Sequence, residues 1–148
     1  MHVLHESQPT IVAFPDPLDR HPDHRATGLF TLLALRHWLP QAPALPRLFA
    51  YLVHWPNWPP GWDTTPPASQ TIEIGLAFPP DLLTRGLVRR ALQLTDAESA
   101  TQRAALALHA SQQAVMPSFL ASFVCRSEPF TEFTAAEVQR VPQLMRQR

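Results

Sequence analysis

The segment TIVAFPDPLDRHPDHRATGLFTLLALRHWL, residues 10–39, carries the strongest fold signal in the chain. It begins with Thr10–Phe14, a short apolar and β-branched run that is typical of a buried strand. A proline-rich loop, Pro15–Pro22, follows this run. Apolar residues at helical spacing then predict a helix from about Asp23 to Leu39, which Pro40 ends. The loop therefore follows the carboxyl end of a strand, where open α/β sheets place their ligand sites.

The rest of the chain alternates between strand and helix patterns. We expect strands at Arg47–His54 and Thr71–Phe78, and Arg89–Leu94 fits either a strand or the end of a short helix. A capping-box pattern at Thr95 predicts one long helix from Asp96 to Val115. Shorter helices are expected at Ser118–Cys125 and Ala135–Arg140. This order predicts an α/β fold, a Rossmann-like layered sheet with helices, built as a single domain over residues 1–148.

The stripe expected to face the interior of the long helix consists of residues at helical spacing. Its members are Ala97, Thr101, Ala104, Leu108, Ser111 and Val115.

Composition excludes several classes of function. The chain has 148 residues, 45% of them apolar, and a formal net charge of zero, so the basic excess of a nucleic-acid binder is absent. All 12 basic residues are arginine, which excludes Schiff-base chemistry on lysine. A single cysteine, Cys125, can form neither an internal disulfide nor a cysteine zinc cage, and it favours a reducing, cytoplasmic location. We expect no signal peptide and no membrane span.

The most informative local pattern is Asp19-Arg-His21-Pro-Asp23-His24, at the end of the first strand and the start of the helix. Residues three apart share a helix face, so both imidazoles can point into one pocket. Imidazole is a common zinc ligand, and neighbouring carboxylates fix its tautomer. Two plainer interpretations stay open. The acids can be turn and cap residues, and the histidine pair can be accidental in an unrelated α/β binding module.

Three segments in order resemble the PIG-L (LmbE-like) family of zinc-dependent N-acetylglucosaminyl deacetylases. His21-Pro-Asp23-His24-Arg-Ala26 resembles the second motif of that family. Arg103-Ala-Ala-Leu-Ala-Leu-His109-Ala-Ser111-Gln112 resembles its Lys-x-x-Ala-x-x-x-His-x-Ser-Gln helix, with Arg103 at the lysine position. Phe123-Val-Cys-Arg126-Ser-Glu128-Pro-Phe130 resembles its closing segment, where an acid precedes an aromatic residue. With the strand at Thr10–Phe14, the resemblance covers about residues 10–130.

The resemblance implies roles for particular residues. His24 would be a zinc ligand, His21 would stabilise or protonate the tetrahedral intermediate, and Asp23 would orient an imidazole. Weaker candidates for substrate binding are Asp19, His54 and His109. The implied cofactor is Zn²⁺, and the implied reaction is hydrolysis of an N-acetyl group on a GlcNAc-type amino sugar conjugate.

One part of the family pattern has no counterpart in this chain. The first motif of the family, Ala-His-Pro-Asp-Asp-Glu, supplies a histidine and an aspartate as zinc ligands and another aspartate as general base. Nothing before Thr10 resembles it, although His2, His5 and Glu6 lie there. The chain is therefore also interpreted as the C-terminal portion of such a domain: a non-catalytic remnant, or one half of a split enzyme whose partner chain carries the motif. Exposed sheet edges in a half-domain would favour self-association.

Two further features have a structural and a functional interpretation. The loop around Trp55, Trp58 and Trp62 could stack on a sugar ring, but burial of a proline-rich loop is the favoured interpretation. Cys125 is expected to be a buried structural thiol, since only Arg126 beside it would lower its pKa.

Overall fold

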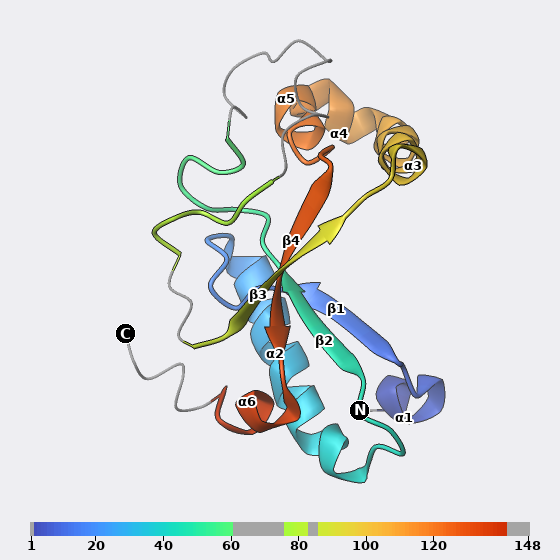
Figure 1. The fold of residues 1–148 in the computed structure, drawn as a ribbon, viewed down its shortest axis with the longest axis vertical. Helices are drawn as coiled ribbons and strands as arrows, with labels where there is room; N and C mark the ends of the chain where they lie inside the picture. Colours follow the sequence, from blue (N-terminus) through green and yellow to red (C-terminus); the bar gives the residue numbers. More distant parts are fainter. Residues whose placement is uncertain (1, 61–75, 83–85, 142–148) are drawn as a thin grey trace. The chain divides into compact units, whose positions relative to one another are not determined.

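The computed structural model describes residues 2–60, 76–82 and 86–141 (Figure 1). The chain divides into two compact units, one of Met1–Val53, Leu83–Arg90 and Phe130–Arg148, the other of His54–Leu82 and Ala91–Pro129. The elements in chain order are α1 His2–Ser7, β1 Ile11–Pro15, α2 Pro22–Trp38, the 3₁₀-helix η1 Leu39–Gln41, β2 Arg47–Tyr51, β3 Val88–Gln93, α3 Asp96–Ala107, α4 Ala110–Val115, α5 Pro117–Ala121, β4 Ser127–Phe133 and α6 Ala135–Gln139.

A four-stranded mixed sheet in the order β1-β2-β4-β3 confirms the predicted α/β class (Figure 1). β1 pairs with β2 in parallel, from Ile11 opposite Arg47 to Pro15 opposite Tyr51. β2 pairs with β4 in antiparallel fashion, with Leu48 opposite Phe133. Because parallel neighbours need a crossover, α2 links β1 to β2 across one face of the sheet. Helices flank this sheet, which is consistent with the expected Rossmann-like layered fold.

The core of the first unit forms where α2 covers the sheet. The buried residues of α2 recur at every third or fourth position, among them Leu32, Leu35 and Trp38, whereas Phe30, which also keeps helical spacing, is 70% exposed. These buried side chains pack against Phe14 of β1 and Leu48 of β2 in a single cluster. Pro40 lies in η1, so the α-helix ends at Trp38. The packing fixes the amino end of α2 beside the carboxyl end of β1.

Gly28 allows α2 to approach the chain after β1 unusually closely. A Cβ at this position would lie 2.2 Å from the carbonyl oxygen of Pro15. Only glycine leaves room for this backbone contact. The loop that follows Pro15 is thereby held against the first turns of α2.

The expected long helix after Asp96 is wrong in extent, because it is broken into α3 and α4. α3 begins with the predicted capping box of Thr95 and Glu98 and ends at Ala107. His109 lies outside helical geometry, with φ −84° and ψ 59°, and the Gln113 side chain donates to the carbonyl of Leu106 near the end of α3. The Leu106 carbonyl also accepts the backbone N–H of His109 at 3.1 Å, so α3 closes with a three-residue bond in place of the four-residue bond of a continuous helix.

The inner stripe proposed for that helix is also wrong. Leu108 is 85% exposed and Val115 is 76% exposed, whereas Ser99 is the buried residue of α3. Apolar residues at helical spacing therefore do not identify the packed face here.

The remaining sequence predictions had mixed outcomes. The segment expected at Arg89–Leu94 is a strand and not the end of a helix, since β3 spans Val88–Gln93, and α6 lies where a helix was expected. Of the expected strand Thr71–Phe78, residues 71–75 lie outside the described residues, and residues 76–78 form no strand. β4 was not predicted. No helix within the described ranges is both long and apolar enough to cross a membrane.

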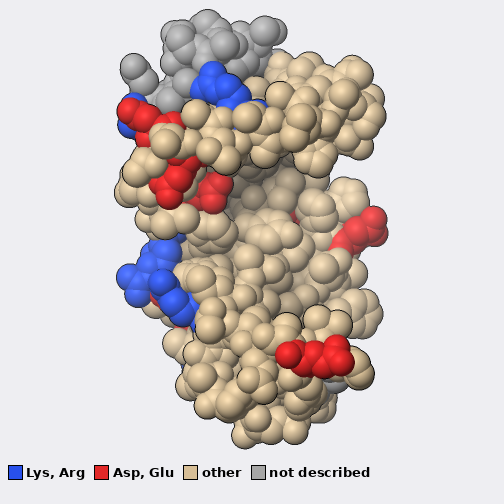
Figure 2. Space-filling model, turned by 90° about the vertical axis from the view of Figure 1, so that its right-hand side faces the viewer, with Lys and Arg blue, Asp and Glu red and all other residues tan. Residues whose placement is uncertain are grey.

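Charged side chains on the face drawn in Figure 2 form small groups separated by uncharged surface. This distribution agrees with a chain whose basic and acidic residues are equal in number, at 12 each.

Candidate metal centre

Asp16 anchors the loop between β1 and α2. Its backbone N–H donates to the carbonyl of Tyr51 at 2.7 Å, and its carboxylate accepts from the Leu18 amide at 2.8 Å and the Thr131 hydroxyl at 3.0 Å. Burial raises the pKa of Asp16, against the opposing effects of these two hydrogen bonds and of the positive charge of Arg89. The loop is therefore tied to β2 and β4 through a buried carboxyl group.

Asp19 is the second buried carboxylate of the loop and is completely inaccessible to solvent. Its Oδ1 accepts the backbone N–H of His21, and its Oδ2 accepts the backbone N–H of Val53, both at 2.8 Å. A buried carboxylate is stable only when such donors surround it. Asp19 thus connects the amino end of α2 to the chain that leaves β2.

His24 lies one turn into α2 with its Nδ1 3.5 Å from Oδ2 of Asp19. Its ring centroid lies 4.9 Å from that of His21, with the planes tilted by 39°. The two imidazoles are therefore neighbours, as the three-residue spacing predicted.

His21 is the N-cap residue of α2. Its Nδ1 accepts the backbone N–H of Asp23 at 3.3 Å. An Nδ1 that accepts a hydrogen bond places the proton of a neutral imidazole on Nε2. His21 itself is partly exposed to solvent.

Asp19, His24 and His54 together form a group that could hold a metal ion. Each offers one ligand atom, and these atoms lie within 4.8 Å of one another. His54 directly follows Val53, whose amide is bound to Asp19, so its backbone position is set by the same contact. Two imidazole nitrogens and a carboxylate oxygen form a donor set that suits zinc and other divalent transition metals, and it does not suit calcium or magnesium.

The other predicted site residues are placed as follows. Asp23 is exposed, and its carboxylate makes no hydrogen bond or ion pair with the part of the chain that the structure describes. The expected role of Asp23 in orienting an imidazole stays a prediction. The carboxylate that lies next to the His24 ring is that of Asp19. His109 is the exposed N-cap residue of α4, in the second unit.

Sequence reasoning treated Asp19 and His54 only as weak substrate-binding candidates. The signal for Asp19 as part of a ligand group was present, because it lies at a strand end before a histidine pair. The signal for His54 was only its place after a strand that pairs with β1. Contacts between residues 30 or more apart depend on the sheet register, which the sequence pattern does not specify.

Trp58 and Cys125, which each had a structural and a functional interpretation, both have structural roles. Trp58 is 4% exposed, and its Nε1 donates to the carbonyl of Ala77, as expected for a residue that buries a loop. Trp62 lies outside the described residues. Burial raises the pKa of the Cys125 thiol to about 11, with a smaller effect from Glu128, so Cys125 is a structural thiol.

The fold and this group define an α/β protein with a candidate metal centre at the carboxyl end of its first strand. Comparison of the chain with models of protein families, with curated proteins and with solved structures found no match in any of the three.

Proposed function

We propose that the chain is a zinc-dependent hydrolase that removes an N-acetyl group from a GlcNAc-type amino sugar conjugate. The observation that carries the proposal is the Asp19–His24–His54 group, with the His21 ring adjacent to it. The resemblance of the segment His21–Ala26 to the second PIG-L motif supplies the reaction class. A catalytic zinc site uses three protein ligands and an open position, and this group offers three donors.

His24 and Asp19 would act as a pair. Nδ1 of His24 and Oδ2 of Asp19 lie 3.5 Å apart, about the separation of two ligands of one tetrahedral zinc ion, so these would be the ligand atoms. Bound zinc supplies a water acidified toward a pKa of about 7 and polarises the amide carbonyl.

His21 would stabilise the tetrahedral intermediate. Its Nδ1 accepts the Asp23 amide N–H, so the neutral ring carries its proton on Nε2. That N–H would donate a hydrogen bond to the amide oxygen as negative charge develops on it. Asp23, one residue from His24, would help to orient a ring, as the resemblance implies.

One observation favours a second candidate, a split or non-catalytic form. Asp19 is wholly buried and already accepts two amide N–H groups, so it is poorly suited to take a proton from water. The general base would then come from a partner chain that carries the Ala-His-Pro-Asp-Asp-Glu motif. In this form the chain binds zinc but hydrolyses nothing by itself.

Zinc binding by the full chain tests the proposal. We expect one zinc per chain in calorimetric titration of the metal-free protein, and binding at least about 10-fold weaker in His24→Ala. The control is His37→Ala, which replaces an exposed histidine in the last turn of the same helix and should bind zinc normally.

Amine release from an N-acetylglucosaminyl conjugate then separates the two candidates. Hydrolysis by the zinc-loaded chain, lost in His21→Ala with zinc retained, supports the autonomous enzyme. Hydrolysis only after addition of a chain with the missing motif supports the split form. If neither the chain nor its His24→Ala variant binds zinc, or both bind it equally, the metal centre is rejected. Tighter binding of Fe²⁺ than of Zn²⁺ would reject zinc chemistry, since the same donor set also suits ferrous iron.

A further inference from the structure

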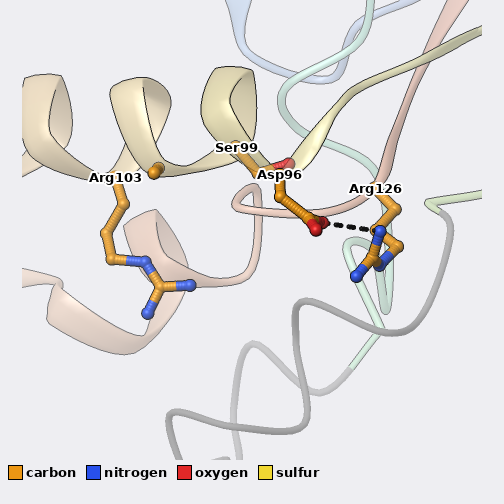
Figure 3. Close-up of a pocket in the computed structure, with 5 residues that line it drawn as sticks. Asp96, Ser99, Arg103 and Arg126 are labelled. Carbon is orange, nitrogen blue, oxygen red and sulfur yellow. Dashed lines mark ion pairs between the residues drawn. The ribbon is translucent and has the colours of Figure 1, made fainter.

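A pocket in the second unit is lined by one face of α3 and by Arg126. Its volume is about 370 Å³, and its lining residues are Asp96, Ser99, Ala100, Arg103 and Arg126 (Figure 3). The four residues from α3 follow the spacing i, i+3, i+4 and i+7, so they share one side of the helix. Liquid water of this volume is about a dozen molecules, which leaves room for a charged group with a small organic part.

Positive charge exceeds negative charge among the side chains that line the pocket. Arg126 Nη1 pairs with Asp96 Oδ1 at 2.8 Å. Arg103 makes no ion pair or hydrogen bond with any residue in the described ranges, and its guanidinium stays charged. The pocket therefore holds two positive charges and one negative charge, with one cation uncompensated.

The two cations lie at opposite ends of the pocket (Figure 3). Side chains of an α-helix lean toward its amino end, so the Arg103 guanidinium turns from its end of the pocket toward Asp96. Arg126 is fixed on the other side, because its carbonyl accepts the Leu94 amide at 2.8 Å just before α3 begins. Ala100 has no side chain beyond Cβ to occupy the space between them.

The ion pair between Asp96 and Arg126 can be replaced easily by a pair between Arg126 and a ligand. The Asp96 side chain is 81% exposed and that of Arg126 is 46% exposed, and such exposed pairs contribute little to stability. A ligand oxyanion could displace Asp96 from Arg126 at small cost and would also neutralise Arg103. A guanidinium group can bind a carboxylate or phosphate in a bidentate manner, with two parallel N–H···O hydrogen bonds.

We propose that this pocket binds the oxyanion of a small organic acid or phosphate ester, held between Arg103 and Arg126, with Asp96 as the group that the anion displaces. The pocket lies entirely within the second unit, so the proposal does not depend on the metal centre or on the deacetylase function.

The test uses the ¹⁵N-labelled full chain at constant ionic strength. Inorganic phosphate and acetate are titrated in separate experiments, and the amide signals of Ala100 and Arg126 are followed. We expect saturable shifts of these signals with at least one anion, and the stronger of the two identifies a phosphate or a carboxylate as the preferred group.

Variants distinguish a built site from general attraction to positive charge. Arg103→Ala should weaken binding about 10-fold, and Asp96→Asn should strengthen it about threefold, since it releases Arg126 and removes a repulsive charge. The control Arg140→Ala removes an exposed arginine in the first unit and should change nothing. Arg126→Lys keeps the positive charge but loses the bidentate hydrogen bonds, so it should weaken binding of the anion.

Linear shifts without saturation would overturn the proposal, as would equal losses in Arg103→Ala and Arg140→Ala. Unchanged or weaker binding in Asp96→Asn would overturn it as well. Arg103 and Asp96 are both exposed, so the decision does not rest on a variant that could disturb folding.

Discussion

The loop between β1 and α2 and the helical segment α3–α4 handle polar groups in opposite ways. The loop buries two carboxylates, Asp16 and Asp19, and satisfies them with amide and hydroxyl donors from distant parts of the chain. The helical segment keeps its charges in solvent and exposes apolar residues such as Leu108 and Val115. Buried polar groups with full partners specify one conformation, so the loop is the part of the molecule built for a fixed site.

The largest effect is expected where the backbone of α2 meets the loop. Gly28→Ala places a methyl group 2.2 Å from the Pro15 carbonyl oxygen, and backbone on both sides must move. We expect the free energy of unfolding to fall by about 3 kcal/mol. Urea denaturation measures it, with Thr27→Ala at the exposed neighbouring position as the control. A loss below about 0.5 kcal/mol would show that the close approach is not a constraint on the loop.

Removal of a buried carboxylate should have the next largest effect. Asp19→Ala leaves the amide N–H groups of His21 and Val53 without their acceptor, which should cost about 2 to 3 kcal/mol of stability. Zinc binding should also be lost, because the group loses one donor and His24 its neighbour. Asp23→Ala is the matched control, since its carboxylate is exposed, and it should cost less than about 1 kcal/mol. Equal losses in the two variants would contradict the structural role of Asp19.

These two positions also show how much the sequence could reveal. The strand, loop and helix of residues 10–39 were predictable because local signals agree, from the β-branched run to Pro22 and the helical spacing. The neighbouring rings of His21 and His24 follow from that helix alone. The donors that surround Asp19, and the place of His54 next to it, depend on pairing between β1 and β2, which no local pattern encodes.

β4 and the α3–α4 break were missed for a related reason. In β4 the buried residues alternate strictly, but they are Ser127, Pro129, Thr131 and Phe133, so hydropathy does not alternate. Thr131 is turned inward by its hydrogen bond to Asp16, a contact across 115 positions of the sequence. In α3–α4, the helical period of alanine and leucine predicted a single helix, and the exposed Leu108 and Val115 do not pack to hold one.

The pH dependence of stability tests the other buried carboxyl group, with a smaller expected effect. Burial raises the pKa of Asp16 above its ordinary value of 3.8, so the folded state binds the proton more tightly than the unfolded chain does. Its contribution to stability is therefore largest below pH 3.8 and is lost as the pH rises through the raised pKa. The Asp16→Asn variant has no titrating group at this position. Its free energy of unfolding, minus that of the native chain, should therefore increase from about pH 3 to about pH 7. Urea denaturation across this range measures it, and a difference that stays constant or decreases would contradict the effect of burial.

The smallest effect is expected at the exposed leucine of the helical segment. Leu108 has the spacing of a core residue, but its side chain is 85% exposed and loses almost no contact when replaced. Leu108→Gln should change the free energy of unfolding by less than about 0.5 kcal/mol, because surface substitutions without special contacts have effects of this size. Leu32→Ala, at a leucine that is 1% exposed, is the comparison and should cost about 3 kcal/mol. A large loss in Leu108→Gln would mean that this face of the segment is covered in solution, and it would remove the contrast between the two regions. A small loss would confirm that Leu108, despite its helical spacing, does not pack against another part of the described chain.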